Sequence, residues 1–248
     1  MASSGTAKLL GKATLITGGS RGIGRAVATA YADAGASVFI CARNQTDVNN
    51  AVSEIRNRGG EIGGVAGNVA RAADVERIVN AALERYGKID VLVNNASVLG
   101  PRQPIQDYPL AAWDEVIQVN LTGLFLVTRA VLPVMLARQC GSIINVTSGV
   151  GRVGKANWGA YAASKGGLES LTQVLADEVK SEGIRVNAVN PAATRTQMRA
   201  EAYPAEDPMT LPTPETVVAI FLHLAADESG DITGRSLNAR DWRGKSFD

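Results

Sequence analysis

Short apolar runs alternate with longer stretches of helical periodicity along almost the whole chain. Several of the short runs place Val and Ile at successive positions, which is typical of strands that are covered on both faces. Alternation of such strands with helices indicates βαβ units, and these units build parallel sheets. The pattern therefore predicts an α/β fold, a doubly wound parallel sheet of about seven strands with helices on both faces.

The strands are expected at Ala13 to Thr17, Ser37 to Ala42, Ile62 to Ala66, Val91 to Asn94, Ser142 to Thr147, Arg185 to Val189 and near Ser236. Helical periodicity is clearest at Gly24 to Ala34, Ala72 to Arg85, Trp113 to Ala137 and Ala162 to Glu182. Neither an internal repeat nor a low-complexity linker interrupts this order. We therefore expect a single domain over residues 1–248.

One region, residues 194–214, departs from the regular order because Pro204, Pro208, Pro212 and Pro214 lie there among short polar and apolar residues. Loops of this length in compact domains are often functional. We expect a substrate flap at 194–214. A variable surface connection is the alternative.

The composition and net charge of the chain indicate which kinds of molecule it binds. The chain has 248 residues, is 46% hydrophobic and 20% charged, and carries a formal net charge of +1. The charges are spread along the chain, so we expect neither a nucleic-acid partner nor a membrane surface. The N-terminal residues lack the apolar stretch of a signal peptide, and no run approaches the roughly 18 apolar residues of a membrane span. These features favour a cytoplasmic protein whose partners are small molecules or copies of itself.

The two cysteines, Cys41 and Cys140, lie far apart and match no zinc or redox spacing. We expect both to be buried, reduced thiols, which suits a reducing compartment. No metal site is expected.

The segment Thr17 to Gly24 reads TGGSRGIG and lies between the first strand and the first helix. Glycines at such a junction let the backbone turn tightly and approach a pyrophosphate. The start of the helix adds free N–H groups and the positive end of the helix dipole. This placement predicts a Rossmann fold whose cofactor contacts include Gly18, Ser20, Arg21, Gly22, Ile23 and Gly24.

The second strand indicates which nicotinamide dinucleotide is bound. NAD-dependent enzymes usually place an acidic residue at the end of this strand to bind the ribose 2′-hydroxyl. Residues 38–44 contain no acid, while Arg43 follows the strand and Arg21 lies within the loop. Two guanidinium groups suit a 2′-phosphate, so the sequence favours NADP over NAD.

A second group of residues carries proton chemistry. Tyr161 and Lys165 are four residues apart in an expected helix, so their side chains lie on adjacent turns of one face. A phenol with a pKa near 10 is a poor acid or base at neutral pH, and lowering that pKa to about 7 takes roughly 4 kcal/mol. A neighbouring ammonium group supplies this kind of perturbation. Ser148, at the end of the fifth strand, is placed to hydrogen-bond a substrate carbonyl oxygen.

These motifs together resemble the short-chain dehydrogenase/reductase family over about Lys8 to Gly234. The pieces that carry the resemblance are TGGSRGIG from Thr17, NNAS from Asn94, VNLTG with Asn120, INVTS ending at Ser148, YAASK from Tyr161, VNAVNPAATRT ending at Thr196 and ITG ending at Gly234. The resemblance implies hydride transfer between a nicotinamide and a carbonyl or alcohol.

The resemblance also implies roles by position. Tyr161 would donate the proton, Ser148 would orient the carbonyl, Lys165 would bind the nicotinamide ribose and lower the pKa of Tyr161, and Asn120 would hold a water of the proton relay. Asn94 and Ala96 would line the cofactor, Asn68 would bind the adenine, and Thr196 would bind the nicotinamide carboxamide. The expected cofactor contacts are completed by Tyr161, Lys165, Val69, Pro191 and Thr194.

Four departures from the family pattern stand out. Asn68 stands where Asp is frequent, Ser97 replaces the glycine after NNA, and Ala192 replaces the glycine after Pro191. The tail RSLNARDW after Gly234 lacks the usual hydrophobic strand and Asp-Gly-Gly turn. Because that tail helps tetrameric relatives to assemble, either a homodimer or a homotetramer is expected here.

The features predict a reductase of aldehydes, ketones or keto esters that uses NADPH. Two alternatives stay open: a 3-oxoacyl-carrier-protein reductase, and a non-catalytic NADP-binding module on the same fold. Ser148, Trp158, Met198 and Tyr203 are the expected substrate contacts, and Val98, Val150 and Met209 could extend an apolar pocket. That lining favours a medium-sized, fairly hydrophobic carbonyl compound.

Overall fold

The computed structural model describes residues 8–242 of the chain. Seven parallel strands form one sheet in the order β3-β2-β1-β4-β5-β6-β7. The strand order reverses between β1 and β4, and ligands of doubly wound sheets bind outside the carboxyl ends of the strands at this reversal. The predicted fold class is confirmed.

The strands are β1 (Ala13–Thr17), β2 (Ser37–Ala42), β3 (Ile62–Ala66), β4 (Val91–Asn94), β5 (Gly141–Val146), β6 (Ile184–Asn190) and β7 (Ser236–Asn238). The helices are α1 (Gly22–Asp33), α2 (Gln45–Asn57), α3 (Ala72–Tyr86), α4 (Leu110–Ile117), α5 (Gly123–Arg138), α6 (Gly149–Arg152), α7 (Gly159–Glu178), α8 (Gln197–Ala202) and α9 (Val218–Ala225). The expected boundaries agree most closely for the strands, because their buried apolar runs end sharply at turn residues.

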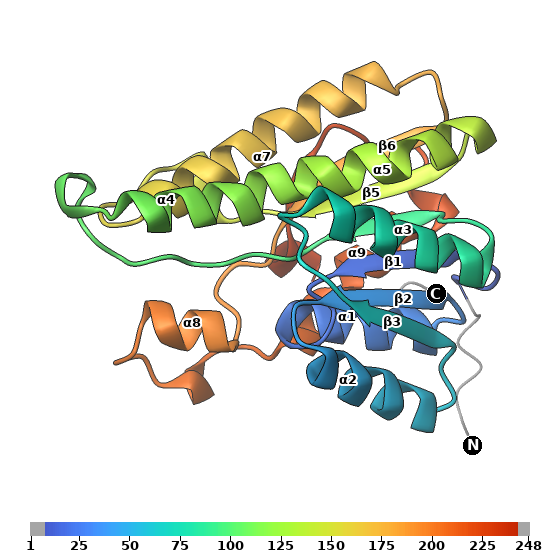
Figure 1. The fold of residues 1–248 in the computed structure, drawn as a ribbon, viewed down its shortest axis with the longest axis horizontal. Helices are drawn as coiled ribbons and strands as arrows, with labels where there is room; N and C mark the ends of the chain where they lie inside the picture. The colour runs from blue at the N-terminus through green and yellow to red at the C-terminus, as the bar shows by residue number, and fades with distance from the viewer. Residues whose placement is uncertain (1–7, 243–248) are drawn as a thin grey trace.

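Two hydrophobic cores lie on opposite faces of the sheet (Figure 1). Helices α1, α2 and α9 build one core, and α3, α5 and α7 build the other. Successive strand residues point to opposite faces, so Ile16 of β1 enters the first core while Leu15 enters the second. On the first face, the buried Tyr31 hydroxyl donates to the Phe221 carbonyl oxygen at 2.8 Å and joins α1 to α9.

The helix expected at Trp113 to Ala137 is a continuous helical run, Leu110–Arg138, in which a π-helical turn η2 (Gln118–Thr122) joins α4 to α5. Single π-helical turns often mark functional sites, and Asn120 lies within this one. By length and mean hydropathy alone this helix of 29 residues could cross a membrane, although polar residues interrupt it and it contains no unbroken run of about 18 apolar residues. A single helix of this kind is weak evidence for a span, because helices that pack against a sheet, as α5 does, pass the same test.

The unusual tail forms the last strand, as predicted near Ser236. Strand β7 pairs with β6 in parallel register. The side chain of Arg152, in α6, donates to Asn238 Oδ1 at 2.8 Å and to Ser236 Oγ at 2.6 Å. Its Nε also donates to Glu169 of α7 at 3.2 Å. The tail is therefore tied to the two helices that follow β5.

The flap region 194–214 leaves the end of β6 and contains α8. Its two ends are joined by Arg195, whose backbone N–H donates to Pro212 O at 2.8 Å and whose Nη2 donates to Leu211 O at 3.1 Å. These bonds close the segment into a loop beside the carboxyl ends of the strands (Figure 1).

Ala192, at the start of the connection to the flap, has a left-handed backbone conformation with φ of 61°. This region costs a residue with a Cβ roughly 1–2 kcal/mol and favours glycine. The conformation is held by a hydrogen bond from Ala192 N to Asn190 Oδ1 at 3.0 Å. The glycine expected from the family pattern at this position is thus the residue that the backbone prefers.

Replacing Ala192 by glycine should raise the free energy of unfolding by about 0.5–1 kcal/mol, because the relief of strain exceeds the added entropy of the unfolded chain. Urea denaturation at unchanged m value measures this change. The neighbouring Ala193→Gly is the matched control and should lower stability, since φ is not positive at Ala193. Lower stability of Ala192→Gly would contradict the assignment of strain.

Candidate active site

The glycine loop after β1 is held against the end of β4 by the side chain of Asn95. Its Nδ2 donates to Thr17 O at 2.9 Å and to Gly18 O at 3.0 Å. A Cβ on Gly18 would lie 2.9 Å from this nitrogen, and a Cβ on Gly24 would clash with it. The two glycines are therefore needed for packing as well as for the approach of a ligand. The sequence argument missed Asn95, although it is the second residue of NNAS.

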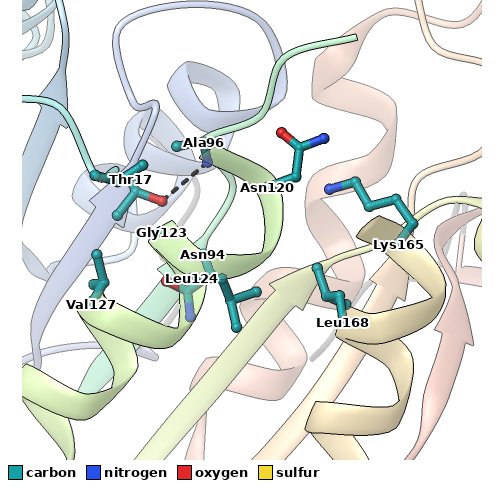
Figure 2. Close-up of a pocket in the computed structure, with 10 residues that line it drawn as sticks. Thr17, Asn94, Ala96, Asn120, Gly123, Leu124, Val127, Lys165 and Leu168 are labelled. Carbon is teal, nitrogen blue, oxygen red and sulfur yellow. Dashed lines mark hydrogen bonds between the residues drawn. The ribbon is translucent and has the colours of Figure 1, made fainter. Parts of the chain in front are cut away.

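The hydroxyl of Thr17 fixes the other side of this junction. Thr17 Oγ1 accepts hydrogen bonds from the backbone N–H groups of Asn95 and Ala96, each at 3.0 Å, and Figure 2 shows the bond to Ala96. The side chain of Asn94 points instead toward α5 and β5, donating to Thr128 Oγ1 and Asn145 Oδ1 at 3.0 Å each. Ala96 thus lies on the predicted cofactor surface, while Asn94 supports that surface from beneath.

The start of α1 suits an anion. Arg21 is the N-cap, its side chain makes no capping hydrogen bond, and the first turn contains no acidic residue. The first N–H groups of the helix are consequently not occupied by a side chain. Gly22 has φ of +56°, and a Cβ there would lie 3.6 Å from Thr196 Cγ2. This tight, uncapped junction fits the pyrophosphate of a dinucleotide, with the flap beginning beside it.

The two arginines expected at a 2′-phosphate are both exposed at this edge of the sheet, and each has a different partner. Arg21 donates to Gln197 Oε1 of α8 at 2.7 Å. Arg43 forms an ion pair with Glu115 of α4 at 3.8 Å, with both side chains 60% exposed. Such solvated contacts contribute little energy, so either guanidinium group can turn to an anion at small cost.

The remaining predicted cofactor residues line the same edge. Asn68 Oδ1 accepts from Ala70 N at 3.0 Å, so its side chain forms the turn that begins α3. Val69 is buried, and Pro191 is buried directly after β6. Thr194 Oγ1 donates to Pro191 O at 3.2 Å. The predictions of direct contact between these residues and a cofactor stay predictions.

Thr196, expected at the nicotinamide carboxamide, caps α8. Its Oγ1 accepts from Arg199 N at 3.1 Å. A threonine hydroxyl that accepts one bond still has a proton to donate.

The structure brings Ser148, Tyr161 and Lys165 together from two elements. Ser148 is the N-cap of α6, directly after β5, and the other two side chains lie on α7. The close approach of α6 to α7 depends on Gly151, where a Cβ would lie 2.7 Å from the carbonyl carbon of Lys165. The sequence argument did not anticipate this role of Gly151, because it arises only when the two helices pack.

Burial raises the pKa of Tyr161 to about 12. The nearby hydroxyls of Ser97 and Ser148 act in the opposite direction and lower the pKa. The expected fall in this pKa is therefore not seen in the protein alone, where enclosure of the phenol outweighs its polar neighbours. Ser97, noted in the sequence only as a departure from glycine, contributes a second hydroxyl beside the phenol.

Lys165 is fully buried and its Nζ donates to Val146 O at 2.8 Å. The ammonium group lies 5.6 Å from the centroid of the Tyr161 ring. Burial lowers the pKa of Lys165 to about 8, so the group remains mostly protonated near pH 7.

Asn120 joins the π-helical turn to the loop after β4. Its Oδ1 accepts from Val98 N at 2.8 Å, and its Nδ2 donates to Val98 O at 2.9 Å and Ser164 Oγ at 3.2 Å. Asn120 and Lys165 line a cavity of about 10 Å³, as Figure 2 shows. Such a volume holds about one water molecule between polar groups. The position is compatible with the relay role that the family resemblance implies.

The expected substrate residues surround the Tyr161 ring. The rings of Trp158 and Tyr161 are 5.6 Å apart, and those of Trp158 and Tyr203 are 6.0 Å apart. Met198 Sδ lies 4.0 Å from the Tyr161 hydroxyl. Met209 is instead 72% exposed on the flap, which corrects its expected place in the pocket.

Val98 and Val150 pack against this aromatic cluster, as expected. Of the two thiols, Cys41 is buried, whereas Cys140 is only half-buried, which corrects one of the two expectations.

A family model described as short chain dehydrogenase matches residues 12–207. An uncharacterized oxidoreductase, YciK, of Escherichia coli strain K12 is 38% identical over 234 residues, which cover 92% of each chain. A 3-oxoacyl-[acyl-carrier-protein] reductase of Synechocystis sp. strain PCC 6803 is 37% identical over 241 residues, covering 93% of this chain and 96% of its own.

A solved structure from Escherichia coli CFT073, assigned as a short chain dehydrogenase and complexed with NADPH, superposes with a TM-score of 0.90. It is 38% identical and covers 94% of this chain and 98% of its own. The sheet order, the glycine loop, and the serine, tyrosine and lysine after β5 agree with this match. The chain therefore belongs to the short-chain dehydrogenase/reductase family of oxidoreductases.

Proposed function

We propose that this chain reduces the carbonyl group of an aldehyde, ketone or keto ester with NADPH as the cofactor. The observation that carries the proposal is the buried Tyr161 hydroxyl, which is adjoined by the hydroxyls of Ser148 and Ser97. The uncapped start of α1 and the exposed Arg21 and Arg43 support NADP(H) as the partner of this site. A similar solved structure is complexed with NADPH.

The chain's own residues perform the proton chemistry. When bound, NADPH supplies the hydride for the carbonyl carbon. Tyr161 donates its hydroxyl proton to the carbonyl oxygen, while Ser148 donates a hydrogen bond that holds the same oxygen in place. A pKa raised by burial keeps Tyr161 protonated at neutral pH, which suits a proton donor in the reducing direction. Tyr161 regains its proton from solvent after each turnover, and the cavity lined by Asn120 and Lys165, which has room for about one water molecule, supports a route for that proton.

A 3-oxoacyl-[acyl-carrier-protein] reductase is the second candidate, because a relative of that activity is 37% identical. The family resemblance implies that reductases of this kind bind an acidic carrier protein through arginines near the ends of the fourth and fifth helices. At the corresponding places this chain has Gln139 and Glu182, and the nearby Arg138 is paired with Asp90 at 3.1 Å. These residues favour a free small molecule over a carrier-bound substrate.

A non-catalytic NADP-binding module is the third candidate. It requires no enclosed proton donor, whereas here Tyr161 and Lys165 are both buried and Ser148 adjoins the phenol. Burying a lysine is costly and is typical of functional sites. We therefore favour the enzyme.

We propose that the active form is a cytoplasmic homo-oligomer, a homodimer or homotetramer. Phe125 of α5 is 44% exposed and Val174 of α7 is 51% exposed. Apolar side chains on neighbouring helices of one face support an interface there.

Wild-type protein should oxidise NADPH in the presence of a panel of aldehydes, ketones and keto esters, and Tyr161→Phe should lower kcat about 100- to 10,000-fold because the proton donor is lost. The decrease in NADPH absorbance measures the rate. Tyr86→Phe, at the far end of α3, is the matched control and should retain kcat. If none of the carbonyl compounds is reduced, or if kcat is unchanged in Tyr161→Phe, the proposal is wrong.

Replacing both Arg21 and Arg43 by alanine should reduce the preference for NADPH over NADH about 100- to 10,000-fold, since charge-assisted hydrogen bonds contribute roughly 1.5–3 kcal/mol each. The ratio of kcat/KM for the two cofactors measures the preference. Arg58→Ala, an exposed arginine after α2, is the control and should leave the ratio unchanged. An unaltered ratio in the double variant would show that the 2′-phosphate binds elsewhere.

Ser97→Ala should raise the pKa of Tyr161, because it removes one of the two hydroxyls that lower this pKa. Alcohol oxidation needs ionised Tyr161, so the rise of kcat/KM with pH should move to higher pH by about 0.5–1 unit. Ser97→Thr keeps the hydroxyl and should retain the wild-type profile. A profile of Ser97→Ala that stays in place or moves to lower pH would exclude this role of Ser97.

A further inference from the structure

Arg102, in the loop between β4 and α4, is half-buried and packs over two neighbouring aromatic rings of the substrate region. Its guanidinium carbon lies 4.9 Å from the centroid of Trp158 and 4.6 Å from that of Tyr203. One nitrogen donates to the carbonyl oxygen of Ala202, at the end of α8. Its Nε is buried and has no hydrogen-bond partner within residues 8–242.

The indole N–H of Trp158 also lacks a hydrogen-bond acceptor among residues 8–242. Its Nε1 is buried, and the ring stacks on Arg102. A buried donor left without an acceptor costs about 1–3 kcal/mol, and such groups in folded proteins call for an explanation. Both orphaned groups are donors, and they belong to side chains in contact with each other. A single group rich in acceptor oxygens would satisfy both.

The side chains around these two donors carry an excess of positive charge. Lys155 Nζ lies 3.1 Å from the Tyr203 hydroxyl, and the guanidinium carbon of Arg199 lies 3.9 Å from the Tyr203 ring. Among residues 8–242, only Arg199 of these cations has a carboxylate partner, Glu206 at 2.6 Å and 2.7 Å. The hydrogen bond from Lys155 and the positive charges of Arg199 and Arg102 lower the pKa of Tyr203. The cluster therefore has more cationic than anionic groups and favours a negative ligand.

This cluster adjoins the reacting position. The Trp158 ring, which contacts Arg102 on one side, lies 5.6 Å from the Tyr161 ring on the other. Its members come from the loops after β4, β5 and β6, which all leave the carboxyl edge of the sheet where ligands of this fold bind. A substrate whose carbonyl is held at Tyr161 would extend toward Arg102 along the Trp158 ring.

We propose that Arg102 and Trp158, assisted by Lys155, bind an anionic oxygen group of the carbonyl substrate, so that the preferred substrates are oxo acids rather than neutral carbonyl compounds. This inference rests on the proposed reductase function and replaces the expected hydrophobic substrate with an acidic one. A carboxylate has two oxygens with several acceptor lone pairs, so it can accept hydrogen bonds from a guanidinium group and from an indole N–H at the same time. A phosphate ester also offers negatively charged acceptor oxygens, and the substrate comparison below distinguishes it from a carboxylate.

The test compares kcat/KM with NADPH for matched substrates: an oxo acid, its methyl ester, its amide, and an oxo phosphate ester of similar length. Wild type should prefer the acid to the ester at least tenfold, and Arg102→Met should reduce this ratio about 10- to 100-fold, the loss expected for a charge-assisted hydrogen bond. Lys155→Met should reduce it less. Arg85→Met removes an arginine that also stacks on a tyrosine, 5.3 Å from the Tyr86 ring, and should leave the ratio unchanged.

A wild-type ratio of one or less, or an unchanged ratio in Arg102→Met, would overturn the inference while leaving carbonyl reduction intact. A preference for the phosphate ester above the carboxylate would overturn the assignment to oxo acids. Should Arg102→Met fail to fold, Arg102→Gln, which retains part of the contact area, provides the same comparison.

Thermal denaturation gives a readout that is independent of turnover. The hydroxy acid product should raise the Tm of wild type, with NADP present, more than that of Lys155→Met, and its ester should raise the Tm of both proteins by a smaller and equal amount. If no carbonyl is reduced but this Tm pattern appears, the proposed function fails and the anion site stands. Equal Tm shifts for acid and ester would contradict the site.

Discussion

The side-chain amide of Asn95 is the contact on which the arrangement of the site depends. By donating to the carbonyl oxygens of Thr17 and Gly18, it joins the central strands β1 and β4 at their carboxyl ends. The glycine loop can approach only because Gly18 and Gly24 have no side chain in this space. The start of α1 is thereby fixed next to the loop after β4, which carries Ser97 and Arg102. One partly buried amide thus sets the cofactor surface and one wall of the substrate region together.

Enclosure then determines the chemistry of that region. Tyr161 is packed by Trp158 and Met198, and the resulting loss of water raises the pKa of the phenol. Two serine hydroxyls partly oppose this effect, so proton transfer depends on the balance between burial and a few polar contacts. The same aromatic cluster also contacts Arg102, through the rings of Trp158 and Tyr203. Reactivity and substrate choice are therefore linked through the Trp158 ring.

The sheet could be predicted from the sequence because buried parallel strands appear as Val- and Ile-rich runs bounded by turn residues. Ser148, Tyr161 and Lys165 could be predicted because their positions at a strand end and on one helix face are local properties. The stacking of Arg102 on Trp158 and Tyr203 could not, since three loops must first converge. The pKa of Tyr161 likewise depends on enclosure, which spacing along a helix does not reveal.

Transfer of deuterium from NADPH labelled at both C4 positions tests the central claim most directly, because it follows the atom that a carbonyl reductase must move. With a carbonyl substrate in ordinary water, mass spectrometry and NMR of the product should find one deuterium on the carbinol carbon. The new hydroxyl proton should come from solvent by way of Tyr161. Product alcohol without deuterium at that carbon, or no alcohol from any carbonyl substrate, would contradict the account.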